Sequence, residues 1–134
     1  MVLTATFLSG CTASSSGLTL AMAPMDGMPM EVQSAATPIR EAYQFAVANK
    51  PILEHIPCYC GCDKMGHTSN YDCYVAPDDS ESRRSYDLHA VKCAVCINIT
   101  HDVMRMTQAG QPLAPIRTFI DQTYSKFGPS TPSL

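Results

Sequence analysis

The sequence predicts a small all-α domain, a bundle of about three helices with a cysteine-rich loop packed on the central helix. Three observations support this fold class. Apolar side chains recur at helical spacing in several stretches. Proline and glycine stand where those stretches begin and end. No run of strand length alternates between apolar and polar residues.

The first helix is expected to begin at Thr37 and Pro38, because threonine is a good N-cap and proline suits the first helical position. Asn49 and Pro51 should end it. Its apolar face consists of Ile39, Ala42, Tyr43, Ala46 and Val47.

The central helix is expected to start near residues 80–82 and to end before Gly110, which has the position of a C-cap glycine. Residues 90–99 are apolar nearly all round, which indicates a helix buried on most sides. A third helix should follow Pro115 and end at Gly128. Its apolar stripe consists of Ile116, Phe119, Ile120, Thr123 and Phe127.

The N-terminal residues favour export. Leu8-Ser9-Gly10-Cys11 resembles a bacterial lipobox, so residues 1–11 are interpreted as a partial lipoprotein signal with Cys11 as the lipidation site. The alternative is an unstructured N-terminus with an idle cysteine. The stretch before the lipobox is apolar but short, and it contains no Lys or Arg.

The other domain boundaries follow from composition. Residues 12–36 are rich in Ser, Ala, Pro and Met without Lys or Arg, which predicts a flexible tether. Its methionines are either mobile Cu(I) ligands or ordinary linker residues. Residues 37–128 should form a helical, cysteine-rich, metal-binding domain, and residues 129–134 a loose tail. The four tether methionines are Met22, Met25, Met28 and Met30.

Composition also limits the partners. The chain has 134 residues, which suits one domain. A net charge of −3 and a pI near 5.7 provide no basic footprint, so no nucleic-acid partner is expected. Seven cysteines in so short a chain are typical of exported proteins and of metal proteins.

The central motif is Pro57-Cys58-Tyr59-Cys60-Gly61-Cys62, with His67 and Cys73 following. In an extended backbone, residues two apart point the same way, so the three sulfurs can aim at one point. Gly61 lets the backbone fold closely behind them. Several soft ligands at one point favour a soft metal such as Cu(I).

Further ligands are expected from the central helix. A helix advances by about 100° per residue, so His89, Cys93 and Cys96 fall on one stripe. Six thiolates exceed the ligands of one tetrahedral Zn(II) and fit a multinuclear Cu(I) cluster with bridging thiolates. The predicted metal ligands are Cys58, Cys60, Cys62, Cys73, Cys93 and Cys96, with His67 and His89 beside them.

Other interpretations of the six cysteines stay open. An exported domain could join them as disulfides and serve as a structural or interaction domain. Cys93 and Cys96 could form a thiol–disulfide redox pair, although we expect them in mid-helix. A zinc–cysteine site is a further alternative. An Fe–S cluster is disfavoured, because the spacing differs from ferredoxin patterns.

The motif Pro57–Cys62, together with Gly66-His67 and Asp72-Cys73, resembles the bacterial PCYCGC-motif lipoprotein family. The resemblance extends from about Tyr43 to the helix that carries Cys93 and Cys96. It implies an exported, often lipid-anchored protein connected with copper handling.

Together these observations predict an extracytoplasmic soft-metal protein, a Cu(I) chaperone or storage lipoprotein acting in copper homeostasis. Its partners would be metal ions, the membrane through the lipid anchor, and a copper-dependent membrane or extracytoplasmic recipient. No nucleophile, base and orienting group form a recognisable set, so we do not expect an enzyme.

Overall fold

A computed structural model describes residues 17–77 and 84–134, and it confirms the all-α fold class. Within these ranges the only β pairing is an isolated bridge between Val75 and Tyr86. No helix in them is long and apolar enough to cross a membrane. The α-helices are α1 (Met30–Gln33), α2 (Thr37–Ala48), α3 (Lys50–Leu53), α4 (Ala94–Gln108) and α5 (Leu113–Tyr124). The 3₁₀ helices are η1 (Cys62–Met65), η2 (Tyr71–Cys73), η3 (His89–Lys92) and η4 (Ser125–Phe127).

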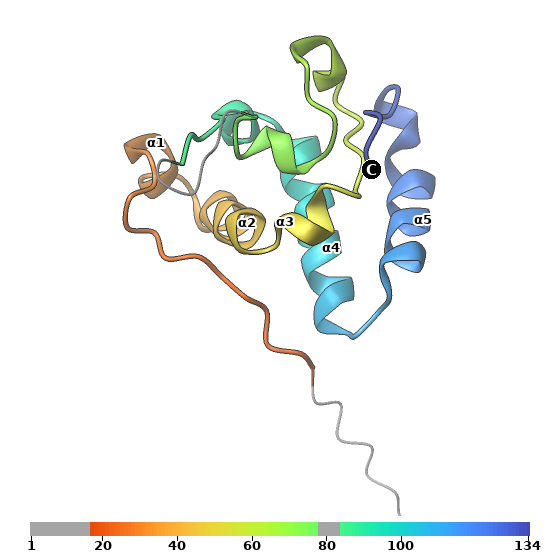
Figure 1. Cartoon of the computed structure of the whole chain (residues 1–134), viewed down its shortest axis with the longest axis horizontal. Helices are drawn as coiled ribbons and strands as arrows, with labels where there is room; N and C mark the ends of the chain where they lie inside the picture. Colours follow the sequence, from red (N-terminus) through yellow and green to blue (C-terminus); the bar gives the residue numbers. More distant parts are fainter. Residues whose placement is uncertain (1–16, 78–83) are drawn as a thin grey trace, which may run out of the picture.

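Helix α4 lies at the centre, between α2 and α5, and packs on both (Figure 1). The loop that carries the cysteine motif and the two short helices η1 and η2 lies at the N-terminal end of α4 (Figure 1). This arrangement confirms the prediction of a cysteine-rich loop packed on the central helix.

Helices α2 and α5 follow their amphipathic patterns. Helix α2 begins at Thr37, with Pro38 in its first turn. Asn49 follows its last residue and donates its side-chain N–H to the carbonyl of Phe45 (2.8 Å). Helix α5 begins slightly earlier than predicted, because Pro115 fits in the first turn, where no N–H partner is needed. Phe127, expected on its apolar stripe, is 55 % exposed.

The central helix was expected to start near residues 80–82, which lie outside the described ranges. Residues 84–93 are described and do not belong to α4, which begins only at Ala94, so the prediction is wrong for this stretch. Tyr86 pairs with Val75, and Asp87 donates its backbone N–H to the carbonyl of Tyr74 (3.0 Å). These contacts hold residues 85–87 extended against the loop, and the short helix η3 follows before Cys93. Cys93 then takes the N-cap position with an extended backbone. Both candidate helix cysteines therefore lie at the start of α4 and not in its middle.

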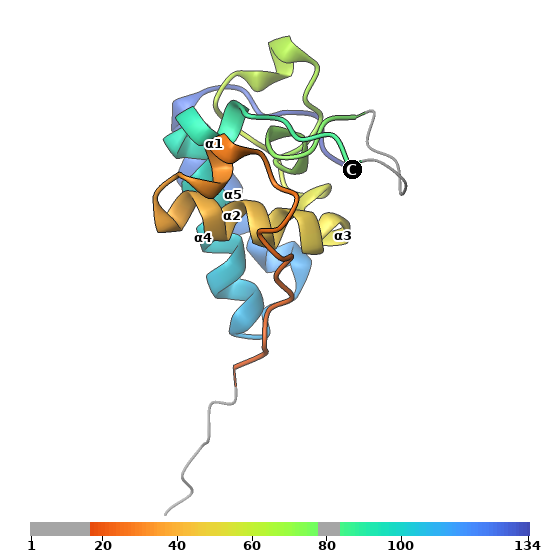
Figure 2. The same cartoon turned by 90° about the vertical axis from the view of Figure 1, so that its left-hand side faces the viewer.

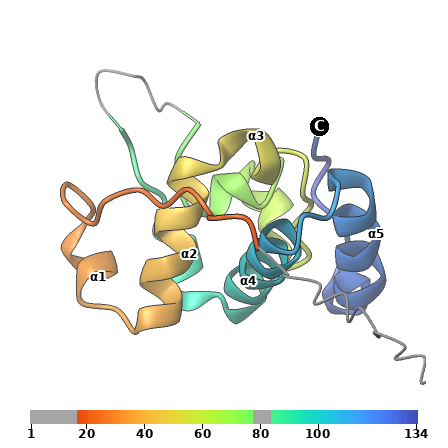
Figure 3. The ribbon, with the colours of Figure 1, turned by 90° about the horizontal axis from the view of Figure 1, so that it is seen from below.

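Residues 17–36 lie along the domain, whereas the sequence predicts a flexible tether. This segment runs past α2 towards the end of α4 (Figure 3). Ala23 donates its N–H to the carbonyl of Gln44, and Leu18 to that of Gln108, both at 2.9 Å. Val32 of α1 is fully buried, because it belongs to the hydrophobic core.

The tether methionines divide into two pairs. Met28 is buried and Met25 packs against the core, so neither has the mobility that the Cu(I)-collecting hypothesis requires. Met22 and Met30 are exposed, and Met30, which is 70 % exposed, belongs to α1, the short helix that packs on α2 (Figure 2). Only the exposed pair still suits a weak surface ligand.

The C-terminal residues, predicted to be loose, clamp the cysteine loop. Thr131 is 1 % exposed and donates its N–H to the carbonyl of Cys58 (2.9 Å). In return its Oγ1 accepts the N–H of Cys58 (2.9 Å). At Gly128 a Cβ atom would lie 3.0 Å from the carbonyl oxygen of Tyr59, so the tail approaches the loop backbone closely. Residues 57–61 of the loop have no regular secondary structure, and the tail supplies partners that their backbone needs.

Replacing Thr131 by valine should destabilise the protein by about 1–3 kcal/mol, because a buried backbone N–H at Cys58 loses its acceptor. Denaturant unfolding of the reduced, metal-free protein measures this change. Ser130 is exposed next to it, so Ser130→Ala is the control and should change the stability by less than about 0.5 kcal/mol. Equal effects of the two substitutions would contradict the clamp.

Candidate metal centre

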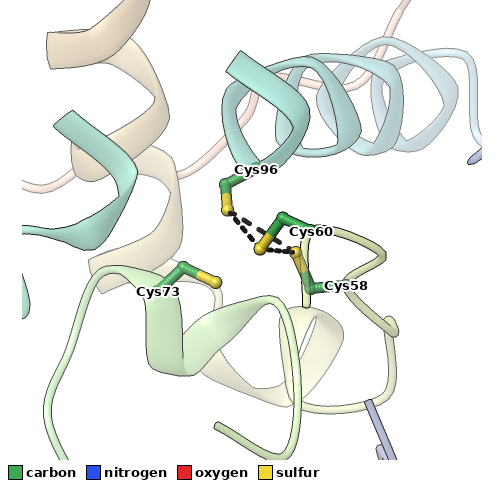
Figure 4. Close-up of side chains that lie close together, drawn as sticks. All are labelled: Cys58, Cys60, Cys73 and Cys96. Atoms are coloured by element: carbon green, nitrogen blue, oxygen red, sulfur yellow. Dashed lines mark hydrogen bonds between the residues drawn. The ribbon is translucent and has the colours of Figure 1, made fainter. Parts of the chain in front are cut away.

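Three sulfur atoms meet where the loop touches α4 (Figure 4). The Sγ atom of Cys58 lies 3.4 Å from that of Cys60 and 3.5 Å from that of Cys96. The third distance, between Cys60 and Cys96, is also 3.5 Å. Two sulfurs bound to one zinc at about 2.3 Å in a tetrahedron lie about 3.8 Å apart. The observed spacing is therefore close to that of thiolates sharing a metal ion.

The sulfurs belong to three overlapping sets of donors, and within each set all ligand atoms lie within 4.8 Å of one another. All six predicted cysteines and His89 occur in these sets, and Cys60 occurs in every one. Cys60 is therefore placed to bridge ions. The sets are Cys58, Cys60, Cys73 and Cys96; Cys60, His89, Cys93 and Cys96; and Cys60, Cys62, Cys73 and His89.

The alternating cysteines do not all aim at one point, as the spacing predicts. Gly61 has a φ of 80°, a left-handed conformation that favours glycine, and it turns the chain between Cys60 and Cys62. Cys62 then starts η1, and its sulfur lies 3.8 Å from that of Cys73. Cys58 and Cys62 consequently share none of the donor sets. The turn distributes the motif over more than one set.

Buried hydrogen bonds attach the loop to the start of α4. The carbonyl of Cys96 accepts the hydroxyl of Tyr74 (3.0 Å) and the side-chain amide of Asn70 (3.4 Å). Thr100 on the next turn donates its hydroxyl to Asn70 Oδ1 (2.7 Å). Asn70 is fully buried and was not singled out by the sequence. These bonds fix the loop cysteines relative to Cys96.

Asp87 connects the two candidate histidines. Its Oδ2 lies 3.2 Å from Nε2 of His67, whose Nδ1 faces the sulfur of Cys73 at 3.6 Å. Its Oδ1 accepts the backbone N–H of His89 (2.7 Å). His89 Nε2 lies 3.3 Å from the sulfur of Cys60. A carboxylate of this kind orients histidine rings at metal sites. No spacing in the sequence points to Asp87.

His67 lies beside the donor sets and not within them. It is 5 % exposed, and the order Cys73–His67–Asp87 matches nucleophile, base and orienting acid. Cys73 is fully buried, however, so a substrate does not reach its sulfur. Hydrogen bonding to Cys58 and burial also raise the pKa of the Cys73 thiol. The arrangement suits a ligand and its positioning groups better than a catalytic triad.

The cluster contains both low-pKa and high-pKa thiols. Contact with Cys60 opposes ionisation of Cys58, but hydrogen bonds from Cys62, Cys73 and Cys96 outweigh it and lower the pKa of Cys58 to about 4. Neighbouring thiols, with Cys58 first, also lower the pKa of Cys60. Hydrogen bonding to both of these raises the pKa of Cys62, Cys73 and Cys96, and hydrogen bonding to Cys60 raises that of Cys93.

Metal binding should therefore release protons. Ligand thiols must lose their protons to bind a metal. At pH 7 the thiols with raised pKa hold theirs, so saturation with Cu(I) should release up to four protons per chain. Because protons compete with the metal, affinity should fall as the pH falls. An indicator dye in weakly buffered solution measures the release. Cys62→Ser should release one proton fewer, and an unchanged count would contradict the assignment.

If the centre holds a soft metal such as Cu(I), replacing Asp87 by alanine should lower the affinity for it by about 10–100-fold, the usual effect of removing a group that orients a metal ligand. Competition with a chromophoric Cu(I) chelator measures the affinity. Asp26 is exposed, so Asp26→Ala is a matched control. Thermal unfolding of the metal-free variants checks that the fold persists. Equal affinities in the two variants would contradict a positioning role for Asp87.

The remaining predicted residues lie away from the centre or outside the described ranges. His101 Nε2 lies 2.9 Å from the carbonyl oxygen of Pro38 at the surface. Asp72 caps a turn by accepting the N–H and the hydroxyl of Thr68. Cys11 and the lipobox lie outside the described residues.

Comparison with known proteins identifies a family. A family model described as "Protein of unknown function with PCYCGC motif" matches residues 3–133. No curated protein and no solved structure matches the chain. The matched range covers nearly the whole chain and includes every cysteine of the centre.

Proposed function

The chain belongs to the PCYCGC-motif family, and we propose that it is an extracytoplasmic Cu(I) chaperone or storage protein with a multinuclear copper–thiolate centre. The family is described as being of unknown function, so the proposal depends on the site. The observation that carries it is the overlap of three donor sets at Cys60.

The donor set favours Cu(I) over zinc. A structural zinc site uses four ligands, whereas this centre gathers six thiols and His89. One Zn(II) would therefore leave at least two of the six thiols without a metal. Several Cu(I) ions held by bridging thiolates would use all six. Soft thiolate ligands also select Cu(I).

The cellular setting is part of the proposal. The lipobox ending at Cys11 supports a membrane-anchored, extracytoplasmic lipoprotein. A store or chaperone needs only capture and release of Cu(I) by ligand exchange, so we propose a binding protein and not an enzyme. The recipient would be a copper-dependent membrane or extracytoplasmic protein.

Anaerobic titration of the reduced protein with Cu(I) against a chromophoric chelator tests this function. We expect more than one Cu(I) per chain, bound tightly enough to compete with the chelator. A parallel Zn(II) titration should show weaker binding. A Cu(I) stoichiometry of one or less, or preferential binding of Zn(II), would overturn the multinuclear copper centre.

The start of α4 supports a second candidate, thiol–disulfide redox chemistry. Cys93 is the N-cap and Cys96 lies in the first turn, where a helix stabilises a thiolate. The pKa of Cys93 is nevertheless raised, chiefly by hydrogen bonding to Cys60, which weakens this candidate. Brief alkylation of the reduced protein, first metal-free and then loaded with Cu(I), separates the two. Redox chemistry predicts rapid labelling of Cys93, whereas the metal centre predicts that Cu(I) protects all six cysteines.

A further inference from the structure

The cysteines of the centre differ in their access to solvent. Four of them are buried, whereas Cys60 and Cys93 are only partly buried. His89, which belongs to the same donor set as both, is also partly exposed. In the described part of the chain, solvent therefore reaches the centre from the side formed by Cys60, His89 and Cys93.

The other sides of the centre are covered. Thr131 covers the backbone of Cys58 and is itself buried. His67 and Tyr74 are buried around Cys73 and Cys96. An incoming ligand would have to disrupt the tail clamp or the buried hydrogen bonds of the loop to approach from these sides.

A surface hollow of about 300 Å³ opens beside Cys93. Its walls are mainly apolar, with Ile39 of α2 facing Val91 and Ile97. Ala94, exposed at the start of α4, also lines it. Lys92 provides the one charged side chain, and no carboxylate lines the hollow. A soft ligand has room to approach Cys93 here.

Cys93 can also move at less cost to the fold than Cys96. It precedes the first residue of α4 and has an extended backbone. Cys96, in contrast, lies inside the helix, and its carbonyl holds two buried side-chain hydrogen bonds. Rotation of the Cys93 side chain leaves the backbone hydrogen bonds of α4 in place.

We propose that Cu(I) is exchanged through this hollow, with Cys93 as the leaving ligand and a cysteine thiolate of a partner protein as the incoming one. The inference rests on the proposed function. The incoming sulfur forms a bond to Cu(I) while the bond from Cys93 Sγ breaks. The Cys93 thiolate leaves with its electron pair and takes up the proton that the incoming thiol loses, so Cu(I) keeps its oxidation state.

The lining defines the chemistry of the partner. Apolar walls suit a short segment of aliphatic residues around the incoming cysteine. Lys92 and the N-terminus of α4 favour negative charge, and a thiolate or its anionic Cu(I) complex supplies it. A partner segment rich in Lys or Arg would be repelled by Lys92.

The test follows transfer of Cu(I) from the loaded full-length chain to a synthetic peptide with one cysteine between aliphatic residues and a glutamate. Ala94→Trp fills the hollow without removing a metal ligand, and Asn98→Trp repeats the block from another lining position. Thr118→Trp places the same bulk on an exposed position of α5. Quenched mass spectrometry gives the transfer rate, and chelator competition gives stoichiometry and affinity.

We expect both hollow variants to transfer Cu(I) about tenfold more slowly than Thr118→Trp at unchanged stoichiometry and affinity. Lys92→Glu should also slow transfer. Transfer by both hollow variants at the control rate would overturn the exchange route. An unchanged rate in Lys92→Glu would overturn the charge preference of the partner. Failure of the wild-type chain to load Cu(I) would instead refute the proposed function itself.

Discussion

Serine in place of Cys60 is expected to prevent assembly of the copper–thiolate centre. Cys60 belongs to all three donor sets, so its loss leaves each set one ligand short. Serine preserves the size of the side chain but offers a hard oxygen where Cu(I) needs sulfur. We expect fewer Cu(I) ions per chain and an affinity lower by more than about 100-fold, beyond the usual effect of removing an orienting group.

The matched control is Cys62→Ser, because Cys62 belongs to only one donor set. Its stoichiometry and affinity should lie between those of the wild type and Cys60→Ser in the same anaerobic titration. If the two variants lose Cu(I) equally, the three sets do not share Cys60. Binding would then be better described by independent sites.

Elements with a complete local pattern could be predicted from the sequence. Helices α2 and α5 have an apolar stripe and a proline in the first turn, and both form close to the predicted positions. The cysteine motif indicated a loop, and the loop docks on α4 as predicted. In each case the information lies within one short stretch of chain.

The features that were not predicted depend on contacts between distant residues. The residues before α4 were expected to be part of that helix, but pairing of Tyr86 with Val75 interrupts it, and only the short helix η3 precedes Cys93. Thr131 is ordered because Cys58 needs backbone partners. Asp87 acts through two histidines that only the fold brings to it. The helix and strand propensities of short stretches of sequence give no information on such contacts between distant residues.

The misplaced helix start did not prevent the ligands from converging. His89, Cys93 and Cys96 were predicted to share a stripe on one helix, yet η3, the N-cap and α4 each supply one of them. They still lie in one donor set with Cys60. They converge through the fold and not through a shared helical stripe, and the irregular backbone leaves Cys93 more accessible than a mid-helix cysteine would be.

Cu(I) binding is expected to stabilise the fold strongly, because the donor sets join the loop to α4. The set formed by Cys58, Cys60, Cys73 and Cys96 combines three loop cysteines with one from the helix. A metal bound only by the folded state stabilises it by about 4 kcal/mol when its free concentration is about 1,000 times Kd. For a domain of this size the unfolding midpoint should rise by roughly 15 °C.

Differential scanning calorimetry of the reduced chain, with Cu(I) buffered by a chelator, measures this shift. Excess chelator should reverse it, since the effect requires bound metal. Cys60→Ser should show a much smaller shift than Cys62→Ser, because only the former breaks the donor sets that include α4 as well as the loop. An unchanged midpoint on addition of Cu(I) would mean that the loop and the helix do not share a metal. The loop would then have to bind Cu(I) without support from Cys96, against the sulfur contacts that join them.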